Sequence, residues 1–467
     1  MDGLIYAYHV NSTDQQKFTT ARIAALKGER QLRDSLKESP NHLERTSSGD
    51  IASWTSVGET IKPIDQWPAH PNESHGAMET ARANYTSSTS SASSHTSEHA
   101  HQALLNNPFE LRHGRRCLRE VGYPLPCDLV EIQRQNLRTL LGCRVFGRAV
   151  CAPGATKRVP RRVLEIGCGS GYWSSMCHEY FCSLGYPNVS FTGLDIAPLA
   201  PDLKKQGLDW TFVQHDFRRP QLPFEDDAFD LVMLKDLSLA LPLGESFQNC
   251  LDEAIRILRE DGTLEIWESD HVLRSLLPHP PPPRSQAPQD RETASITATF
   301  LIAPGTPFAP AHNKYLQHAN TWVSAALSKR DLPPLPCARI AQVLYQETES
   351  LKDVGIRRVA IPLGELRWER ESPNSAPRST VSGRGKMKVT DGLLTADQAA
   401  LRQTALLTVL QMIESLEPLL KEVSGKNTEE WGHWWASMMA DLLDPTRGAL
   451  TGECLEVGAW WATKVSE

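Results

Sequence analysis

Several features that would identify a function directly are missing from this chain of 467 residues. Its ten cysteines contain no C-x-x-C pair, so their spacing predicts neither a zinc site nor a disulfide framework, and we expect no metal. No apolar run approaches the ~18–20 residues that span a bilayer. The first residues also lack the basic and apolar regions of a signal peptide. We therefore expect no membrane association and a location in the cytoplasm, the nucleus or both.

The basic charge that binds nucleic acid is also scarce. The formal net charge is −7, and the small basic clusters at 112–119 and 157–162 are far from a dense basic stripe. Phosphate contacts need such a stripe, so we expect no nucleic-acid partner. The apolar content of 40% supports a sizeable core, and the length allows two domains or one elaborated domain.

A glycine-rich turn within residues 163–173 is the most informative motif. An apolar run passes through acidic Glu165 and is followed by Gly167, Gly169 and Gly171, after which an amphipathic helix is predicted. Glycine reaches backbone angles that other residues avoid, and free N–H groups at a helix start favour a negative ligand group. A strand, a glycine turn and a helix thus predict a nucleotide-type pocket. The G-x-G-x-G spacing differs from the G-x-G-x-x-G dinucleotide fingerprint, which disfavours an NAD-dependent oxidoreductase.

Later segments fit the same plan. Predicted strands end at Asp195, at Asp216 and at Lys235-Asp236, and helices are predicted over 172–184 and 245–259. Strands that alternate with helices imply a parallel sheet covered on both faces. Ligands of such sheets bind at the carboxyl ends of the strands, so we expect these acidic residues and Glu165 to converge on one crevice.

In this order and spacing, the segments resemble the class I S-adenosylmethionine-dependent methyltransferases, firmly over about 160–270 and loosely over about 105–465. The resemblance implies an α/β, Rossmann-like fold with a mostly parallel seven-stranded sheet and, here, helical N- and C-terminal additions. Tyr123, a Leu-Pro turn and a predicted helix over 128–146 resemble the pre-core segment of a fungal group that includes the velvet-complex regulator of secondary metabolism. In that group the helix packs over the cofactor pocket. This chain departs from the group by Cys127 at the turn and by a Gly-Cys-Gly-Ser-Gly loop without threonine.

The resemblance also implies which residues bind S-adenosylmethionine. The expected set is Glu165, Gly167, Gly169, Gly171, Asp195, Ile196, Asp216, Phe217 and Lys235. The glycines let the backbone approach the methionine part, and Glu165 organises the loop and binds the amino group. Asp195 holds the ribose with Ile196 on the adenine, while Asp216 accepts from the adenine amino group beside Phe217.

The methyl acceptor is not indicated, beyond being a small molecule or a protein. The chain lacks the Asn/Asp-Pro-Pro-aromatic motif of enzymes that methylate nucleic-acid amino groups. Asp236 and His271 are candidate bases, which are needed only if the acceptor loses a proton; ordinary loop structure is the alternative for both. A second hypothesis is a cofactor-binding regulatory protein with little turnover that acts through protein partners.

The expected organisation has four parts. Residues 1–104 read as a largely disordered Ser/Thr/His-rich extension, which could bind regulatory partners. A methyltransferase domain follows over 105–370, with a Pro-rich insertion at about 278–293, and then a linker over 371–390. Residues 391–467 are expected to form a helical, Trp-rich region, in which the tryptophans either cover an acceptor or pack in a core.

Overall fold

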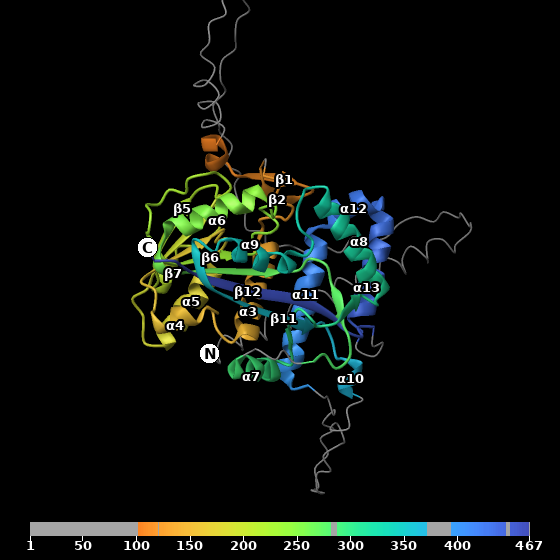
Figure 1. Cartoon of the computed structure of the whole chain (residues 1–467). Helices are drawn as coiled ribbons and strands as arrows, with labels where there is room; N and C mark the ends of the chain where they lie inside the picture. The colour runs from red at the N-terminus through yellow and green to blue at the C-terminus, as the bar shows by residue number, and fades with distance from the viewer. Residues whose placement is uncertain (1–100, 120, 282–286, 371–393, 445–448, 467) are drawn as a thin grey trace, which may run out of the picture. The chain divides into compact units, whose positions relative to one another are not determined.

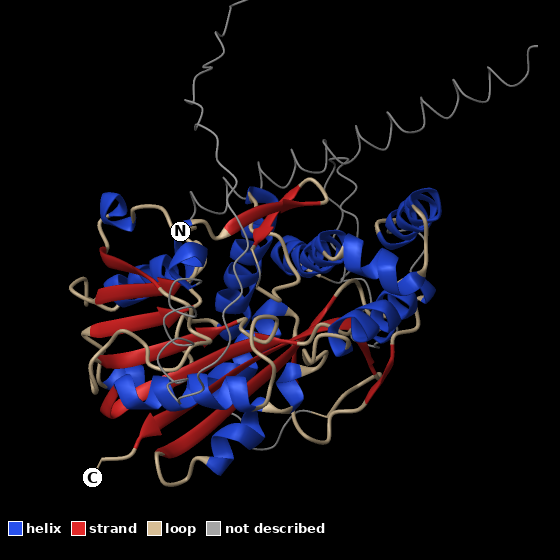
Figure 2. Cartoon of the chain, turned by 90° about the horizontal axis from the view of Figure 1, so that it is seen from above, coloured by secondary structure: helices blue, strands red, loops and turns tan. Residues whose placement is uncertain are grey.

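The computed structural model describes residues 101–119, 121–281, 287–370, 394–444 and 449–466 (Figure 1). The expected extension before residue 101 and the expected linker lie outside these residues. Within them, helices cover both faces of a central sheet (Figure 2). No helix in these ranges is long and apolar enough to cross a membrane. All ten cysteines are free thiols.

The sheet contains the parallel core that the sequence predicts. Five parallel strands lie in the order β5-β4-β3-β6-β7. Their bounds are Arg162–Ile166 (β3), Ser190–Asp195 (β4), Asp209–Gln214 (β5), Phe229–Lys235 (β6) and Leu258–Ser269 (β7). The sheet continues with β12 (Glu453–Lys464), which runs antiparallel between β7 and β11 (Leu351–Pro362). The expected α/β fold is therefore confirmed, and these seven strands, five of them parallel, form the main part of the sheet.

Short strands extend this sheet at one side. They are β8 (Arg274–Leu276), β9 (Phe300–Ile302) and β10 (Phe308–Pro310), so the sheet has ten strands among the residues described. A separate hairpin of β1 (Phe109–Arg112) and β2 (Arg115–Leu118) precedes the core.

Each face of the sheet has its own apolar core. One core contains Trp173 and Phe181, and the other contains Phe247 and Leu251. The helices of the first face are α3 (Leu129–Phe146), α5 (Tyr172–Ser183), α7 (Pro288–Thr297) and α11 (Ala396–Ser415). Those of the second are α6 (Glu245–Ile257) and α9 (Ile340–Gln346). Shorter elements are α4 (Pro153–Lys157), η1 (Leu203–Gln206), η2 (Pro336–Ala338) and α10 (Arg367–Arg370).

A tryptophan cluster joins α8 (Lys314–Ser328) to α13 (Thr428–Leu442), beside α12 (Glu417–Ser424). The ring centroid of Trp434 lies 4.7 Å from that of Trp322 and 4.9 Å from that of Trp431. Trp431 and Trp434 are buried in the first core. These tryptophans were expected either to cover an acceptor or to pack in a core, and the structure places Trp431 and Trp434 in a core.

The expectation of a helical region over 391–467 is wrong at its C-terminal end, because the last element is strand β12. Its side chains alternate between the two faces of the sheet: Trp460 lies in the second core and Trp461 packs against the first. Gly355 of β11 accommodates the Trp461 ring, since a Cβ there would collide with it. The C-terminal strand therefore completes the sheet, and the domain does not end at residue 370. Part of the Pro-rich insertion expected at about 278–293 is helical, because α7 begins at Pro288.

Candidate functional site

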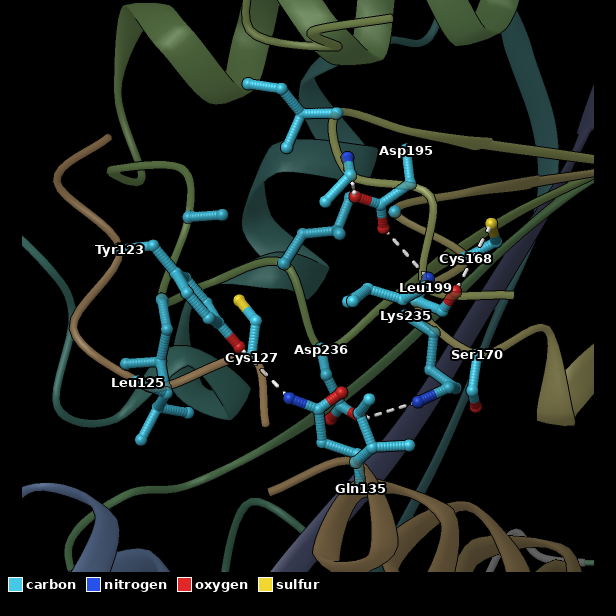
Figure 3. A pocket seen from close by; sticks show the side chains of 18 of the residues that line it. Tyr123, Leu125, Cys127, Gln135, Cys168, Ser170, Asp195, Leu199, Lys235 and Asp236 are labelled. Atoms are coloured by element: carbon cyan, nitrogen blue, oxygen red, sulfur yellow. Dashed lines mark hydrogen bonds and ion pairs between the residues drawn. The ribbon is translucent and has the colours of Figure 1, made fainter. Parts of the chain in front are cut away.

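One large cavity lies at the carboxyl ends of β3, β4 and β6 (Figure 3). It holds about 1220 Å³ with its open mouth included. Its lining brings together most of the expected residues: Glu165, Gly167, Gly169, Asp195, Ile196, Asp216, Phe217, Lys235, Asp236 and His271. Gly171 is the expected residue that is not on the cavity lining.

The three glycines have left-handed backbones for different reasons. At Gly167 (φ +69°) a Cβ would meet Leu237 at 2.5 Å, and at Gly171 (φ +68°) it would meet Leu203 at 2.9 Å. At Gly169 (φ +51°) the nearest atom to a Cβ would be Oε1 of Gln135, at 3.6 Å. Two glycines are thus required by packing, whereas a Cβ at Gly169, on the cavity lining, would make only an ordinary van der Waals contact.

Asp195 fixes the glycine turn to the end of β4. Its Oδ2 accepts from the Gly169 N–H at 2.8 Å, and its Oδ1 accepts from the Ala197 N–H at 3.1 Å. Burial raises the pKa of Asp195 against the lowering effect of these N–H groups. The carboxylate is therefore held rigidly at the cavity, in the position expected for a ribose ligand.

Glu165 joins the end of β3 to the start of α5. Its Oε2 accepts from the Ser174 hydroxyl at 2.7 Å and from the Ser174 N–H at 3.3 Å. Burial raises the pKa of Glu165 to about 7, even though the charge of Lys235 acts in the opposite direction. Glu165 thus ties β3 to α5, and its expected role in organising the loop and binding the amino group stays a prediction.

Asp216 has a partner that the sequence analysis missed. Arg218 donates to it from Nε at 2.8 Å and from a terminal nitrogen at 2.6 Å. Burial raises the pKa of Asp216, but Arg218 outweighs burial and the net shift is downward. Ile196 and Phe217 are buried on the same lining.

The two candidate bases are poorly suited to removing a proton at neutral pH. Asp236 accepts from Nζ of Lys235 at 2.6 Å, and its pKa lies below the ordinary value because Lys235 and Arg138 outweigh burial. The imidazole of His271 is buried, with Nε2 at 3.0 Å from the Ser238 hydroxyl, and burial lowers the pKa of His271 to about 3. Efficient general bases have a pKa near the working pH.

The segment before the core and helix α3 cover the cavity. Figure 3 shows Tyr123, Leu125 and Cys127 on one side of it, facing Gln135 of α3. Nε2 of Gln135 donates to the Tyr123 hydroxyl at 3.3 Å. The helix thus packs over the pocket, as the fungal resemblance implied.

Arg115 of β2 connects the segment before α3 to helix α11. It donates twice to Asp128 at 2.7 Å and once to the Ser415 hydroxyl of α11 at 3.3 Å. Met412 of α11 also reaches the cavity. No local sequence signal pointed to Met412, because α11 follows the sheet core by more than a hundred residues of chain.

Residues 163–262 match the family described as a methyltransferase domain, and this range contains the glycine turn, Asp195, Asp216 and Lys235. Over these residues the chain resembles the class I S-adenosylmethionine-dependent methyltransferases. Its cavity is the one at the carboxyl ends of β3, β4 and β6.

Curated proteins are similar to this methyltransferase domain over part of their length. The secondary metabolism regulator laeA of Aspergillus niger is 28% identical over 32% of this chain and 36% of its own length. The protein-methionine methyltransferase laeA of Emericella nidulans is 29% identical over 28% and 33%. A malonyl-acyl-carrier-protein O-methyltransferase of Legionella pneumophila is 33% identical over 27% and 40%. The chain thus spans about a third of the fungal relatives and two fifths of the bacterial one.

Proposed function

We propose that the domain binds S-adenosylmethionine in the cavity and transfers its methyl group to a small-molecule or protein acceptor. The observation that carries the proposal is the link between Asp195 and the Gly169 N–H at the open part of the glycine turn. It fixes a carboxylate and the backbone of a glycine on one cavity lining.

The residues present fit this cofactor. Gly169 leaves room for a ligand against the main chain, and Asp195 can accept from ribose hydroxyls in addition to its two N–H donors. Ile196 and Phe217 offer apolar surface for a purine, and Glu165 lies at the inner end beside Ser174. In the proposal, Asp216 serves the adenine amino group while paired with Arg218.

The bound cofactor supplies an electrophilic methyl carbon, so the protein's part is to bind and orient. Tyr123, Leu125 and residues of α3 line the cavity and are placed to contact bound ligands. Holding the acceptor near attack distance contributes several kcal/mol through proximity. An acceptor that attacks without losing a proton needs no base, and this suits the low pKa values of Asp236 and His271.

The test is calorimetric titration of the full chain with S-adenosylmethionine and, separately, with NAD. Saturable binding of the first, lost in Asp195→Ala and Gly169→Val, supports the proposal. Asp202→Ala, at an exposed turn, is the matched carboxylate control and keeps wild-type affinity. Well-folded wild-type protein that does not bind S-adenosylmethionine, or binds NAD instead, contradicts it.

The second candidate is a cofactor-binding regulatory protein with little turnover, in the cytoplasm or the nucleus. The name of one fungal relative, the secondary metabolism regulator laeA, favours it. Protein partners bound through residues 1–104 belong to this proposal. Labelled methyl transfer separates the two: S-adenosylmethionine binding without transfer to small acids, to proteins or to the chain itself supports the regulatory reading.

A further inference from the structure

Arg138 of α3 lies where two cavities meet. It lines the large cavity and also a smaller one of about 270 Å³, which Lys235, Asp236 and Trp267 line as well. Its side chain is 93% buried, since 7% of the residue is exposed. The guanidinium donates from Nε to the Ser269 hydroxyl at 3.1 Å. One terminal nitrogen is buried and has no hydrogen-bond partner.

Other cations of the large cavity are already paired. The ion pairs are Arg134 with Glu131, Lys235 with Asp236, and Arg218 with Asp216, each at 2.6 Å. Across the described ranges, no carboxylate lies within ion-pair distance of Arg138. Arginine keeps its charge in proteins, so this guanidinium is a buried cation that feels the charge of Asp236 but has no ion pair of its own. Such a group is costly unless it is paired.

The acids nearest to Arg138 do not supply the missing charge. Asp236 is bound by Lys235. Glu268 accepts from the N–H and the hydroxyl of Ser238, at 2.7 and 2.9 Å. Burial, with the charge of Asp236, raises the pKa of Glu268 to about 8, which disfavours its charged form. The unpaired nitrogen of Arg138 is therefore available to a ligand in the cavity.

We propose that Arg138 binds a carboxylate of the methyl acceptor, and that the acceptor is a small organic acid. The inference rests on the proposed function, because Arg138 shares the cavity with Gly169 and Asp195. A single unpaired cation matches one negative charge, which favours a carboxylate over a phosphate dianion. The burial of Arg138 favours a slender acid over the side chain of a folded protein. Arg138 is then a specificity-determining residue that orients the acceptor.

The experiment uses the full chain saturated with S-adenosylhomocysteine. Acetate, hexanoate and benzoate are titrated against their neutral amides by ligand-observed NMR, with inorganic phosphate and an N-acetyl-Glu peptide amide as further probes. We expect carboxylates to bind and amides not to bind. Arg138→Met weakens carboxylate binding by at least about tenfold, as for loss of a charged hydrogen bond. Arg144→Met, at an exposed position of the same helix, is the matched control and changes nothing.

Thermal melting adds a readout that a merely structural arginine would not give. Removing an unpaired buried charge leaves the melting temperature of Arg138→Met equal to or above that of the wild type. Carboxylates raise the melting temperature of the wild type but not of the variant. A large drop in the melting temperature of Arg138→Met would assign Arg138 a structural role and overturn the inference.

The remaining outcomes separate this inference from the proposed function. Normal S-adenosylhomocysteine binding with carboxylates no better than amides, or equally bound by Arg138→Met, overturns the inference alone. So does tighter binding of phosphate or of the glutamyl peptide than of every small acid. Failure of the wild type to bind S-adenosylhomocysteine overturns both.

Discussion

A Gly169→Ala substitution, compared with a control glycine elsewhere, tests whether the cofactor binds against the glycine turn, independently of its effect on the stability of the fold. The Gly169→Ala variant keeps the N–H that Asp195 accepts, and its Cβ meets no protein atom closer than 3.6 Å. The new methyl group instead occupies the space where the main chain is open to the cavity. The matched control is Gly425→Ala, at the C-cap of α12, where φ is +66° and no atom lies within 4 Å of the added Cβ.

The magnitudes follow from these geometries. Each alanine must adopt a left-handed backbone, which costs about 1–2 kcal/mol. Alanine also lowers the conformational entropy of the unfolded chain, which stabilises the folded state by about 0.4–1 kcal/mol. Both variants should therefore lose about 1 kcal/mol of unfolding free energy. Overpacking by a methyl group costs about 1–3 kcal/mol, so Gly169→Ala alone should weaken ligand affinity by roughly 5- to 150-fold.

The assay is calorimetric titration with S-adenosylhomocysteine, together with urea unfolding of the same preparations. Gly425→Ala should bind like the wild type despite its lower stability. If Gly169→Ala binds with an unchanged Kd, the cofactor does not lie against this turn, and the assignment of the cavity is wrong. If both variants lose affinity equally, the loss reflects stability and the reasoning from open space fails.

Two other predictions follow from the buried groups. The raised pKa of Glu165, about 7 in the fold against 4.5 in the unfolded chain, means that the native state binds more protons between these values. Its contribution to the unfolding free energy therefore falls by at most about 3 kcal/mol as pH rises from 4.5 to 7. Between pH 5 and pH 8, urea unfolding should show a smaller loss of unfolding free energy in Glu165→Gln than in the wild type. Glu179→Gln, at an exposed position of α5, should lose as much as the wild type. If Glu165→Gln has the same pH dependence as the wild type, Glu165 is not the group responsible. Trp434→Ala should lower the unfolding free energy by about 3–5 kcal/mol and leave the Kd of S-adenosylhomocysteine unchanged, because its ring packs on Trp322 and Trp431; a change in Kd would place the tryptophan cluster at the ligand.

The part of the fold that the sequence predicted is local in the chain. In α5 three of the six residues that the apolar spacing marks are fully buried, namely Trp173, Cys177 and Phe181. Met176 and Tyr180 are partly buried, and Leu184 is exposed. The acidic strand ends meet because parallel strands share an edge, which the order of elements implies. Strand β12 could not be predicted in the same way. Its pairing with β7 and β11 joins residues far apart in sequence, and the nearby tryptophan-rich helix favoured a continued helical reading.

Helix α3 shows why the acceptor side of the site was missed. Its spacing marked Ile132, Leu137, Leu140 and Leu141 as the buried side, yet only Leu141 of these four is fully buried. Its buried residues include Glu131, Arg134 and Arg138.

The cause lies in contacts that no local pattern contains. The hydroxyl of Ser415 on α11 donates to Glu131 at 2.8 Å across 284 residues of chain, and Ser269 of β7 accepts from Arg138. Packing of α11 and the sheet against α3 thus buries charges that a helical wheel assigns to solvent. Glu131 and Arg134 compensate each other, and the remaining charge is Arg138. An uncompensated cation that tertiary packing places at a cavity is the kind of feature that a fold retains for a ligand, since its burial is unfavourable in the absence of one.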